Sequence, residues 1–161
     1  MSANSHSHPI VDLIRIESFS ASHRLNSAAL SAEENKEIFG KCNNLNGHGH
    51  NYRWEVYLRG MVDEKTGMVY NLENLKREMA AVMDLVDHKN LDIDVDYFRE
   101  NKMVTTSENV AIFLYDSLKE RMEKPDLLLK VKVHETDKNS FVYKGQRMIP
   151  IDDSGHQLMH Q

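Results

Sequence analysis

Apolar and polar positions alternate along two stretches near the N-terminus, and this period of two predicts β-strands. The first stretch runs from Val11 to Ser22 and is followed directly by His23. The second runs from His48 to Arg59, where one parity holds His48, His50, Tyr52, Trp54, Val56 and Leu58. Two more strands are expected near the C-terminus, at Leu127 to Thr136 and at Ser140 to Lys144, and a short one at Met68 to Tyr70.

A period near 3.6 in the middle of the chain predicts two amphipathic helices. The first extends from a cap at Asn71 to about Val86. The second opens with a capping box over residues 105–108, extends to about Lys124 and ends before Pro125. A shorter helix is expected from Ser31 to Phe39, with Cys42 to Gly47 as a loop and residues 97–104 as an irregular connection.

The order of these elements is β-β-α-α-β-β, with the minor helix in the first half. Two amphipathic helices can cover one face of an antiparallel sheet, so the pattern predicts an α+β fold with four antiparallel strands. We expect one domain over residues 11–145, a flexible lead over residues 1–10 and a polar tail over residues 146–161.

The composition of the chain argues against several classes of protein. The 161 residues carry a formal net charge of −5, which gives no basic surface for nucleic acid. No apolar run approaches the roughly 20 residues of a membrane span. The single cysteine excludes an internal disulfide, and the N-terminus lacks the features of a signal peptide. Cytoplasm is the default location.

Two histidines, His48 and His50, are spaced to lie on one face of the second strand. An HxH pair alone is weak evidence for a metal, but His23 ends the neighbouring strand and supplies a third imidazole. Zn²⁺ favours imidazole nitrogen, so we expect a zinc site of these three ligands.

Three other features carry chemistry. Cys42 lies in a polar loop, although free cysteine is often a buried apolar residue. Asp87 precedes His88 at a helix end, where the pair is either solvated or a proton-handling group. Glu135 ends an apolar strand face, where it is either solvated or an anchor for a ligand.

These residues together resemble the 6-pyruvoyltetrahydropterin synthase family. The resemblance covers about Ile16 to Gly145 and depends on four stretches of sequence, which are residues 19–25, 40–52, 85–92 and 131–145. It implies the tunnelling fold, in which three subunits close a β-barrel and two trimers stack into a hexamer. It also implies conversion of 7,8-dihydroneopterin triphosphate to 6-pyruvoyltetrahydropterin, with release of triphosphate, in tetrahydrobiopterin synthesis.

The resemblance assigns roles residue by residue. His23, His48 and His50 match the zinc ligands, with one Zn²⁺ per subunit. The matches to the catalytic residues are Cys42, Asp87 and His88. Glu135 matches the pterin anchor, and Thr106, Ser107 and Glu108 match the loop that lines the pterin pocket. Position 107 is Ser where Thr is expected, which retains a hydroxyl.

Two other functions remain open. A 6-carboxytetrahydropterin synthase would act on the same substrate, but the five residues between Cys42 and His48 favour the pyruvoyl enzyme. A catalytically inactive, zinc-stabilised assembly protein would need the three histidines. It would have no use for Cys42, Asp87, His88 and Glu135 together.

Overall fold

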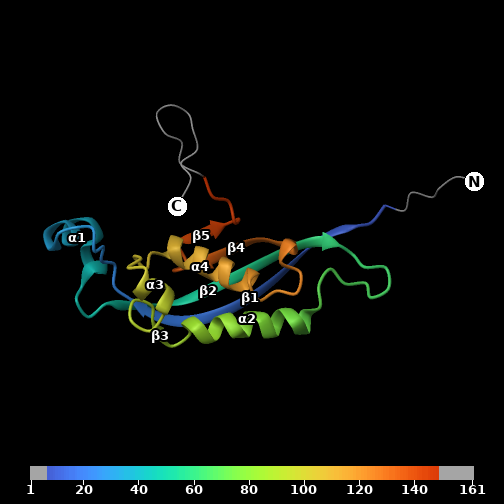
Figure 1. Ribbon diagram of the computed structural model, residues 1–161, viewed down its shortest axis with the longest axis horizontal. Coiled ribbons are helices and arrows are strands. Elements are labelled where there is room, and N and C mark those ends of the chain that lie inside the picture. Colours follow the sequence, from blue (N-terminus) through green and yellow to red (C-terminus); the bar gives the residue numbers. More distant parts are fainter. Residues whose placement is uncertain (1–6, 149–161) are drawn as a thin grey trace, which may run out of the picture.

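The computed structural model describes residues 7–148, and its central feature is one twisted sheet (Figure 1). The two longest strands are β1 (Ile10–His23) and β2 (His48–Met61), which pair antiparallel along their whole length from Ile10 opposite Met61 to His23 opposite His48. Strand β4 (Leu128–His134) pairs antiparallel with β2, and β5 (Ser140–Tyr143) pairs antiparallel with β4. These are the four predicted strands.

The sheet has a fifth strand that the sequence pattern did not predict. Strand β3 (Lys89–Asn90) pairs parallel with Ala21 and Ser22 of β1, so the sheet is mixed and its order is β3-β1-β2-β4-β5. The expected strand at Met68 to Tyr70 is absent, because these residues form a loop instead. The α+β class is confirmed, whereas the purely antiparallel four-stranded sheet is corrected to a mixed sheet of five strands.

Two of the predicted helices have the expected starts and ends. Helix α1 (Ala32–Phe39) has the predicted capping box between Ser31 and Glu34, and α2 (Leu72–Val86) is capped by Asn71. A 3₁₀ helix, η1 (Gly40–Asn43), replaces part of the expected loop that contains Cys42.

The second long helix, α4 (Ser107–Lys119), is shorter than predicted. Its cap is Thr106, and the Thr105 hydroxyl bonds elsewhere. Between α4 and β4 the chain forms a 3₁₀ helix, η2 (Pro125–Leu127). A five-residue helix, α3 (Asp96–Glu100), lies in the segment expected to be irregular.

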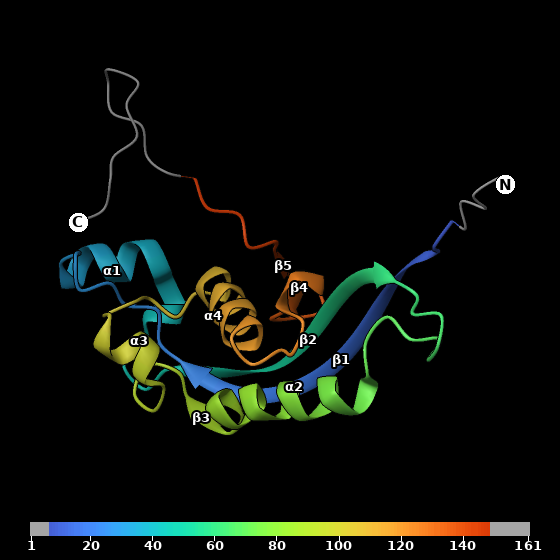
Figure 2. The same cartoon turned by 45° about the vertical axis from the view of Figure 1, so that its right-hand side comes forward.

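The hydrophobic core lies between one face of the sheet and helices α2 and α4 (Figure 2). Helix α2 packs against β1, and α4 packs against β4 and β5. The inward residues of β2 are all fully buried from Tyr52 to Leu58, as the alternation predicted. Because this face is apolar except at the His48 end, the polar residues there are set against a rigid core.

The opposite face of the sheet is uncovered by helices and carries polar side chains. Glu55 on β2 is only 8% exposed there, because it accepts hydrogen bonds from Tyr57, Arg53 and His134. The His134 contact, 2.7 Å long, joins β2 to β4. Among the described helices, none has the length and apolar character needed to cross a membrane.

The structure describes a few residues of the expected N-terminal lead and C-terminal tail. Strand β1 begins at Ile10, and the Pro9 carbonyl accepts a hydrogen bond from Val62. At the other end, Arg147 bonds Asp116 of α4. Most of the expected lead and tail, residues 1–6 and 149–161, lies outside the described residues.

Candidate functional site

Three histidines meet at one end of the sheet. His23 is the last residue of β1 and lies opposite His48, the first residue of β2, while His50 lies opposite Ala21. One ring nitrogen from each imidazole lies within 4.8 Å of the others. The long antiparallel register therefore brings together the three residues predicted as metal ligands, because all of them share the inward parity of their strands.

The ring orientations suit a metal ion. His23 Nδ1 lies 2.7 Å from the Thr105 carbonyl, which can only accept, so Nδ1 carries the proton and Nε2 is left as a lone-pair donor. That Nε2 lies 3.1 Å from His48 Nε2. A tetrahedral zinc with Zn–N bonds of about 2.0–2.1 Å would hold two such nitrogens about 3.3–3.4 Å apart. His50 Nε2 is buried without a hydrogen-bond partner within residues 7–148.

The protonation of the cluster also favours metal binding. Burial lowers the pKa of His23, and this outweighs its hydrogen bond to Thr105, while the nearby imidazoles lower the pKa further. Burial likewise lowers the pKa of His50, against the opposing charge of Glu135. Both groups are therefore neutral near pH 7, which is the form of imidazole that coordinates metals.

Three surrounding residues hold His23 in place, and the contacts of two of them, Asp92 and Thr105, were not predicted from the sequence. Asp92 accepts hydrogen bonds from the Arg24 amide at 2.6 Å and from the Thr105 hydroxyl at 2.7 Å. It thus fixes Thr105, whose carbonyl orients His23. Gly47 packs so closely that a Cβ on it would lie 2.7 Å from the His23 carbonyl oxygen. Asp92 acts through a backbone amide and a hydroxyl that the fold brings near it, so it leaves no spacing signal in the sequence.

Glu135, the predicted pterin anchor, lies beside the histidines. It follows β4 directly, and its Oε1 is 3.6 Å from His50 Nε2. The Ser107 hydroxyl donates to the same oxygen at 2.9 Å. Of the three predicted pocket residues, only Ser107 reaches Glu135; Thr106 caps α4, and Glu108 is exposed in its first turn.

Cys42 is positioned next to the segment that follows His23. Its backbone carbonyl accepts from the Leu25 amide at 2.9 Å, and the Arg24 side chain donates to the Asn43 carbonyl at 2.9 Å. The thiol is partly exposed. Within the described part of the chain, no hydrogen bond links Cys42 to Asp87 or His88.

The side chains of Asp87 and His88 lie within ion-pair distance of each other at the edge of the sheet. His88 Nδ1 lies 2.9 Å from Asp87 Oδ2, and Asp87 Oδ1 accepts from the Ser20 amide at 2.9 Å. That backbone bond, with a smaller effect of His88, lowers the pKa of Asp87. His88 has a positive φ of 58°, which turns the chain from α2 into β3 and leaves its side chain 84% exposed.

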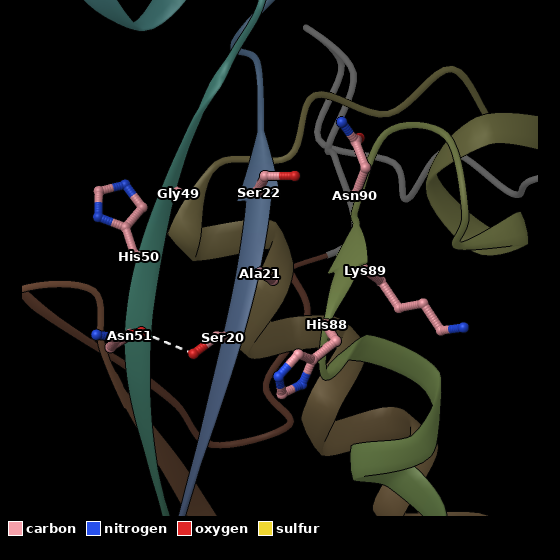
Figure 3. Close-up of a pocket in the computed structure, with 9 residues that line it drawn as sticks. All are labelled: Ser20, Ala21, Ser22, Gly49, His50, Asn51, His88, Lys89 and Asn90. Atoms are coloured by element: carbon pink, nitrogen blue, oxygen red, sulfur yellow. Dashed lines mark hydrogen bonds between the residues drawn. The ribbon is translucent and has the colours of Figure 1, made fainter.

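A shallow pocket of about 380 Å³ opens beside this pair, between the ends of β1, β2 and β3 (Figure 3). His88 lines it together with the Ser20–Asn51 pair, which is joined by a 2.7 Å hydrogen bond. His50 also belongs to its lining, so the pocket and the histidine cluster share β2. Within one chain, the predicted catalytic residues therefore lie in two places. Cys42 is near the histidine cluster, whereas Asp87 and His88 form an exposed pair at the edge of the sheet.

The fold and the site define the class: an α+β protein with a three-histidine candidate metal centre and an adjacent carboxylate. The chain belongs to the 6-pyruvoyl tetrahydropterin synthase family, whose model matches residues 12–146. It is therefore a member of an enzyme family of lyases, as the sequence resemblance implied.

Individual relatives agree with this assignment. The human 6-pyruvoyl tetrahydrobiopterin synthase is 55% identical over 130 residues, covering 80% of this chain and 88% of that protein. A solved structure of 6-pyruvoyl tetrahydropterin synthase from Caenorhabditis elegans superposes with a TM-score of 0.83 at 58% identity, covering 86% of this chain and 98% of that one. A 6-carboxy-5,6,7,8-tetrahydropterin synthase from Aquifex aeolicus is more distant, at 31% identity over 136 residues.

Proposed function

We propose that this protein converts 7,8-dihydroneopterin triphosphate to 6-pyruvoyltetrahydropterin, with elimination of triphosphate, in tetrahydrobiopterin biosynthesis. The observation that carries the proposal is the juxtaposition of Glu135 with the three-histidine cluster, only 3.6 Å from His50. A pterin needs an acceptor for its ring edge and a cation for its side-chain oxygens, and this site has a carboxylate beside three histidines that could hold a cation.

Glu135 would hold the pterin ring. The ring presents adjacent N–H donors on its aminopyrimidinone edge, which one carboxylate can accept in a two-pronged hydrogen bond. Because Ser107 already occupies one position on Oε1, the plane of the carboxylate is restricted before the substrate arrives. A pterin ring held by Glu135 would have its side chain close to the three histidines.

We assign the metal as Zn²⁺, one per subunit, held by His23, His48 and His50. Imidazole ligands and a tetrahedral geometry with an open fourth position are typical of catalytic zinc. Zinc bound there would polarise a side-chain oxygen of the substrate and make the adjacent C–H bonds more acidic. Elemental analysis should find stoichiometric zinc in the purified protein and none in a folded His48→Ala variant.

Proton transfer is assigned to Cys42, Asp87 and His88. The Cys42 thiolate would remove carbon-bound protons, and the Asp87–His88 pair would accept or relay them, with Asp87 orienting the imidazole through Nδ1. The electrons shift within the substrate, and the triphosphate leaves with the bonding pair. The net change is an internal redox rearrangement, so the reaction consumes no nicotinamide or flavin.

The assembly is proposed from the family resemblance: trimers that close a β-barrel, stacked as a hexamer. The open sheet supports it, because β1 from Ile10 to Ser20 and β5 present strand edges that pair with no other strand among residues 7–148. A cytoplasmic location and a single functional domain over residues 11–145 stay predictions.

One experiment tests the reaction directly. Incubation of the zinc-loaded protein with 7,8-dihydroneopterin triphosphate, followed by mass spectrometry, should give 6-pyruvoyltetrahydropterin and free triphosphate. Formation of a 6-carboxy product would establish the alternative activity instead, and an unchanged substrate with zinc bound would support an inactive assembly protein.

A further inference from the structure

The carboxylate of Asp92 supports His23 through one of its two oxygens. Asp92 Oδ1 accepts a hydrogen bond from the Thr105 hydroxyl at 2.7 Å, and the Thr105 carbonyl accepts one from His23 Nδ1 at 2.7 Å. Thr105 and His23 are both fully buried, so these bonds lie away from water. Outer-shell bonds of this kind fix the orientation of an imidazole and leave its other nitrogen free for a metal.

The other oxygen of Asp92 supports the turn that contains Cys42. Asp92 Oδ2 accepts from the Arg24 amide at 2.6 Å. The Arg24 side chain reaches the 3₁₀ helix η1, where its Nε donates to the Asn43 carbonyl at 2.9 Å. The next residue, Leu25, donates its amide to the Cys42 carbonyl at 2.9 Å. The segment that Asp92 holds is therefore the segment that holds the Cys42 turn.

Strand β3 explains how Asp92 reaches this position. The strand pairs in parallel with the end of β1 (Figure 3), and the Leu91 amide then bonds the Ser22 carbonyl at 2.8 Å. The Asp92 amide in turn donates to the Asn90 side chain at 3.0 Å. Two residues of strand pairing thus place a carboxylate beside the Arg24 backbone, where the chain passes from β1 towards the Cys42 turn.

We propose that Asp92 is a positioning residue that holds the metal centre and the Cys42 thiol in one relative geometry. The two carboxylate oxygens accept separately, so one side chain restrains both groups at once. Loss of Asp92 should disturb metal binding and thiol chemistry together, whereas a change further along either chain of bonds should disturb one of them. The inference rests on the proposed roles of His23 as a zinc ligand and of Cys42 as the general base.

Asp92→Ala removes both restraints. Isothermal zinc titrations should show binding weaker by about 10- to 100-fold, the usual loss when an outer-shell partner of a metal ligand is removed. With saturating zinc and 7,8-dihydroneopterin triphosphate, kcat should still be lower by about 10- to 100-fold, because misplaced reacting groups slow the chemical step. The matched control is Asp96→Ala, since Asp96 is exposed on α3 and its carboxylate bonds Arg99. It should match wild type in both measurements.

Variants along the two chains separate this role from a general loss of stability. Thr105→Val, which lacks the hydroxyl, should weaken zinc binding about tenfold, and Thr105→Ser should retain wild-type affinity. Arg24→Ala keeps the amide that bonds Asp92 but loses the bond to Asn43, so it should lower kcat about tenfold without changing zinc affinity. Amide hydrogen exchange over residues 40–43 should rise in Arg24→Ala and Asp92→Ala, and stay at the wild-type level in Thr105→Val.

Asp92→Asn provides a second test that preserves the shape of the side chain. Its single acceptor oxygen is needed by the Arg24 amide, which can only donate, so zinc binding should weaken while exchange over residues 40–43 stays unchanged. Wild-type zinc affinity in both Asp92 variants, wild-type kcat in Asp92→Ala, or an equal loss of zinc affinity in Arg24→Ala would each overturn the inference. Normal zinc binding by His48→Ala, or near-normal turnover of Cys42→Ala, would instead contradict the proposed function itself.

Discussion

Cys42 is the residue on which the proposed proton transfer depends. Its position is set by backbone contacts to the segment after His23, which do not involve the sulfur atom. Side-chain replacements at position 42 should therefore leave the neighbouring histidines in place. The catalytic role of the thiol can therefore be tested without disturbing the position of the loop.

We expect Cys42→Ala to retain zinc, fold and neopterin affinity but to lose turnover by about 10²–10⁴-fold, the usual loss when a general base is removed. Cys42→Ser should be nearly as inactive, because a hydroxyl is much harder to deprotonate than a thiol. Steady-state assays on zinc-loaded proteins measure this. Near-normal turnover in Cys42→Ala would remove the thiol from the mechanism.

At the scale of elements, Glu55 connects two strands on the open face of the sheet. Burial alone would raise the pKa of its carboxyl, but hydrogen bonds from Tyr57 and His134 and the charge of Arg53 give a net lowering. A carboxyl whose pKa is lower in the folded state stabilises the protein above its unfolded pKa of about 4.3. That contribution is lost as pH falls through the folded pKa.

Glu55→Gln should accordingly lower the free energy of unfolding by about 1–2 kcal/mol at pH 6. The difference from wild type should shrink as the pH is lowered from about 4.3 towards 3, where the wild-type carboxyl also becomes neutral. Urea unfolding of both proteins across this range measures it. A difference that stays constant with pH would show that the carboxylate charge is not responsible.

The elements that the sequence predicted well are those defined by their own periodicity. Both long strands and the starts of α1 and α2 follow from side-chain alternation and capping residues, and the parity of β2 placed His48 and His50 on one face. Strand β3 was missed because its two residues, Lys89 and Asn90, pair through backbone atoms only and leave no period to detect.

The end of α4 was missed for a tertiary reason. Its apolar stripe continues to Met122, which predicted a helix to Lys124, but the Glu123 amide bonds the Tyr70 hydroxyl and Glu78 of α2 instead. A contact made 53 positions away overrides local propensity. The support of His23 by Asp92 and Thr105 escaped prediction likewise, since it depends on a backbone carbonyl brought in by the fold.

At the scale of the whole molecule, the exposed Asp87–His88 pair and the Cys42 thiol are not joined within one chain. We predict that they meet across a subunit interface, with the pair of one chain completing the site of another. Cys42→Ala and His88→Ala homo-oligomers should each be inactive. After subunit exchange in equal amounts, mixed oligomers should regain up to about a quarter of wild-type activity, because one site in four receives both intact groups.

Subunit exchange must be verified independently, for example by mass spectrometry of differently tagged chains. Activity that returns only when exchange has occurred supports a shared site. Verified mixed oligomers without activity would indicate that each chain completes its own site by a rearrangement.

The tight contact at Gly47 makes the candidate metal centre dependent on a residue that is not one of its predicted ligands. A methyl group there would press against the His23 carbonyl at 2.7 Å, and the φ of 70° is also unfavourable for alanine. Gly47→Ala should push the ends of β1 and β2 apart and weaken zinc binding while all three imidazoles remain. Because binding follows mass action, excess zinc should restore Gly47→Ala but not His48→Ala, which isothermal zinc titrations would reveal. An inherited change at this glycine would therefore present as a conditional defect, masked or exposed by the zinc supply of the cell.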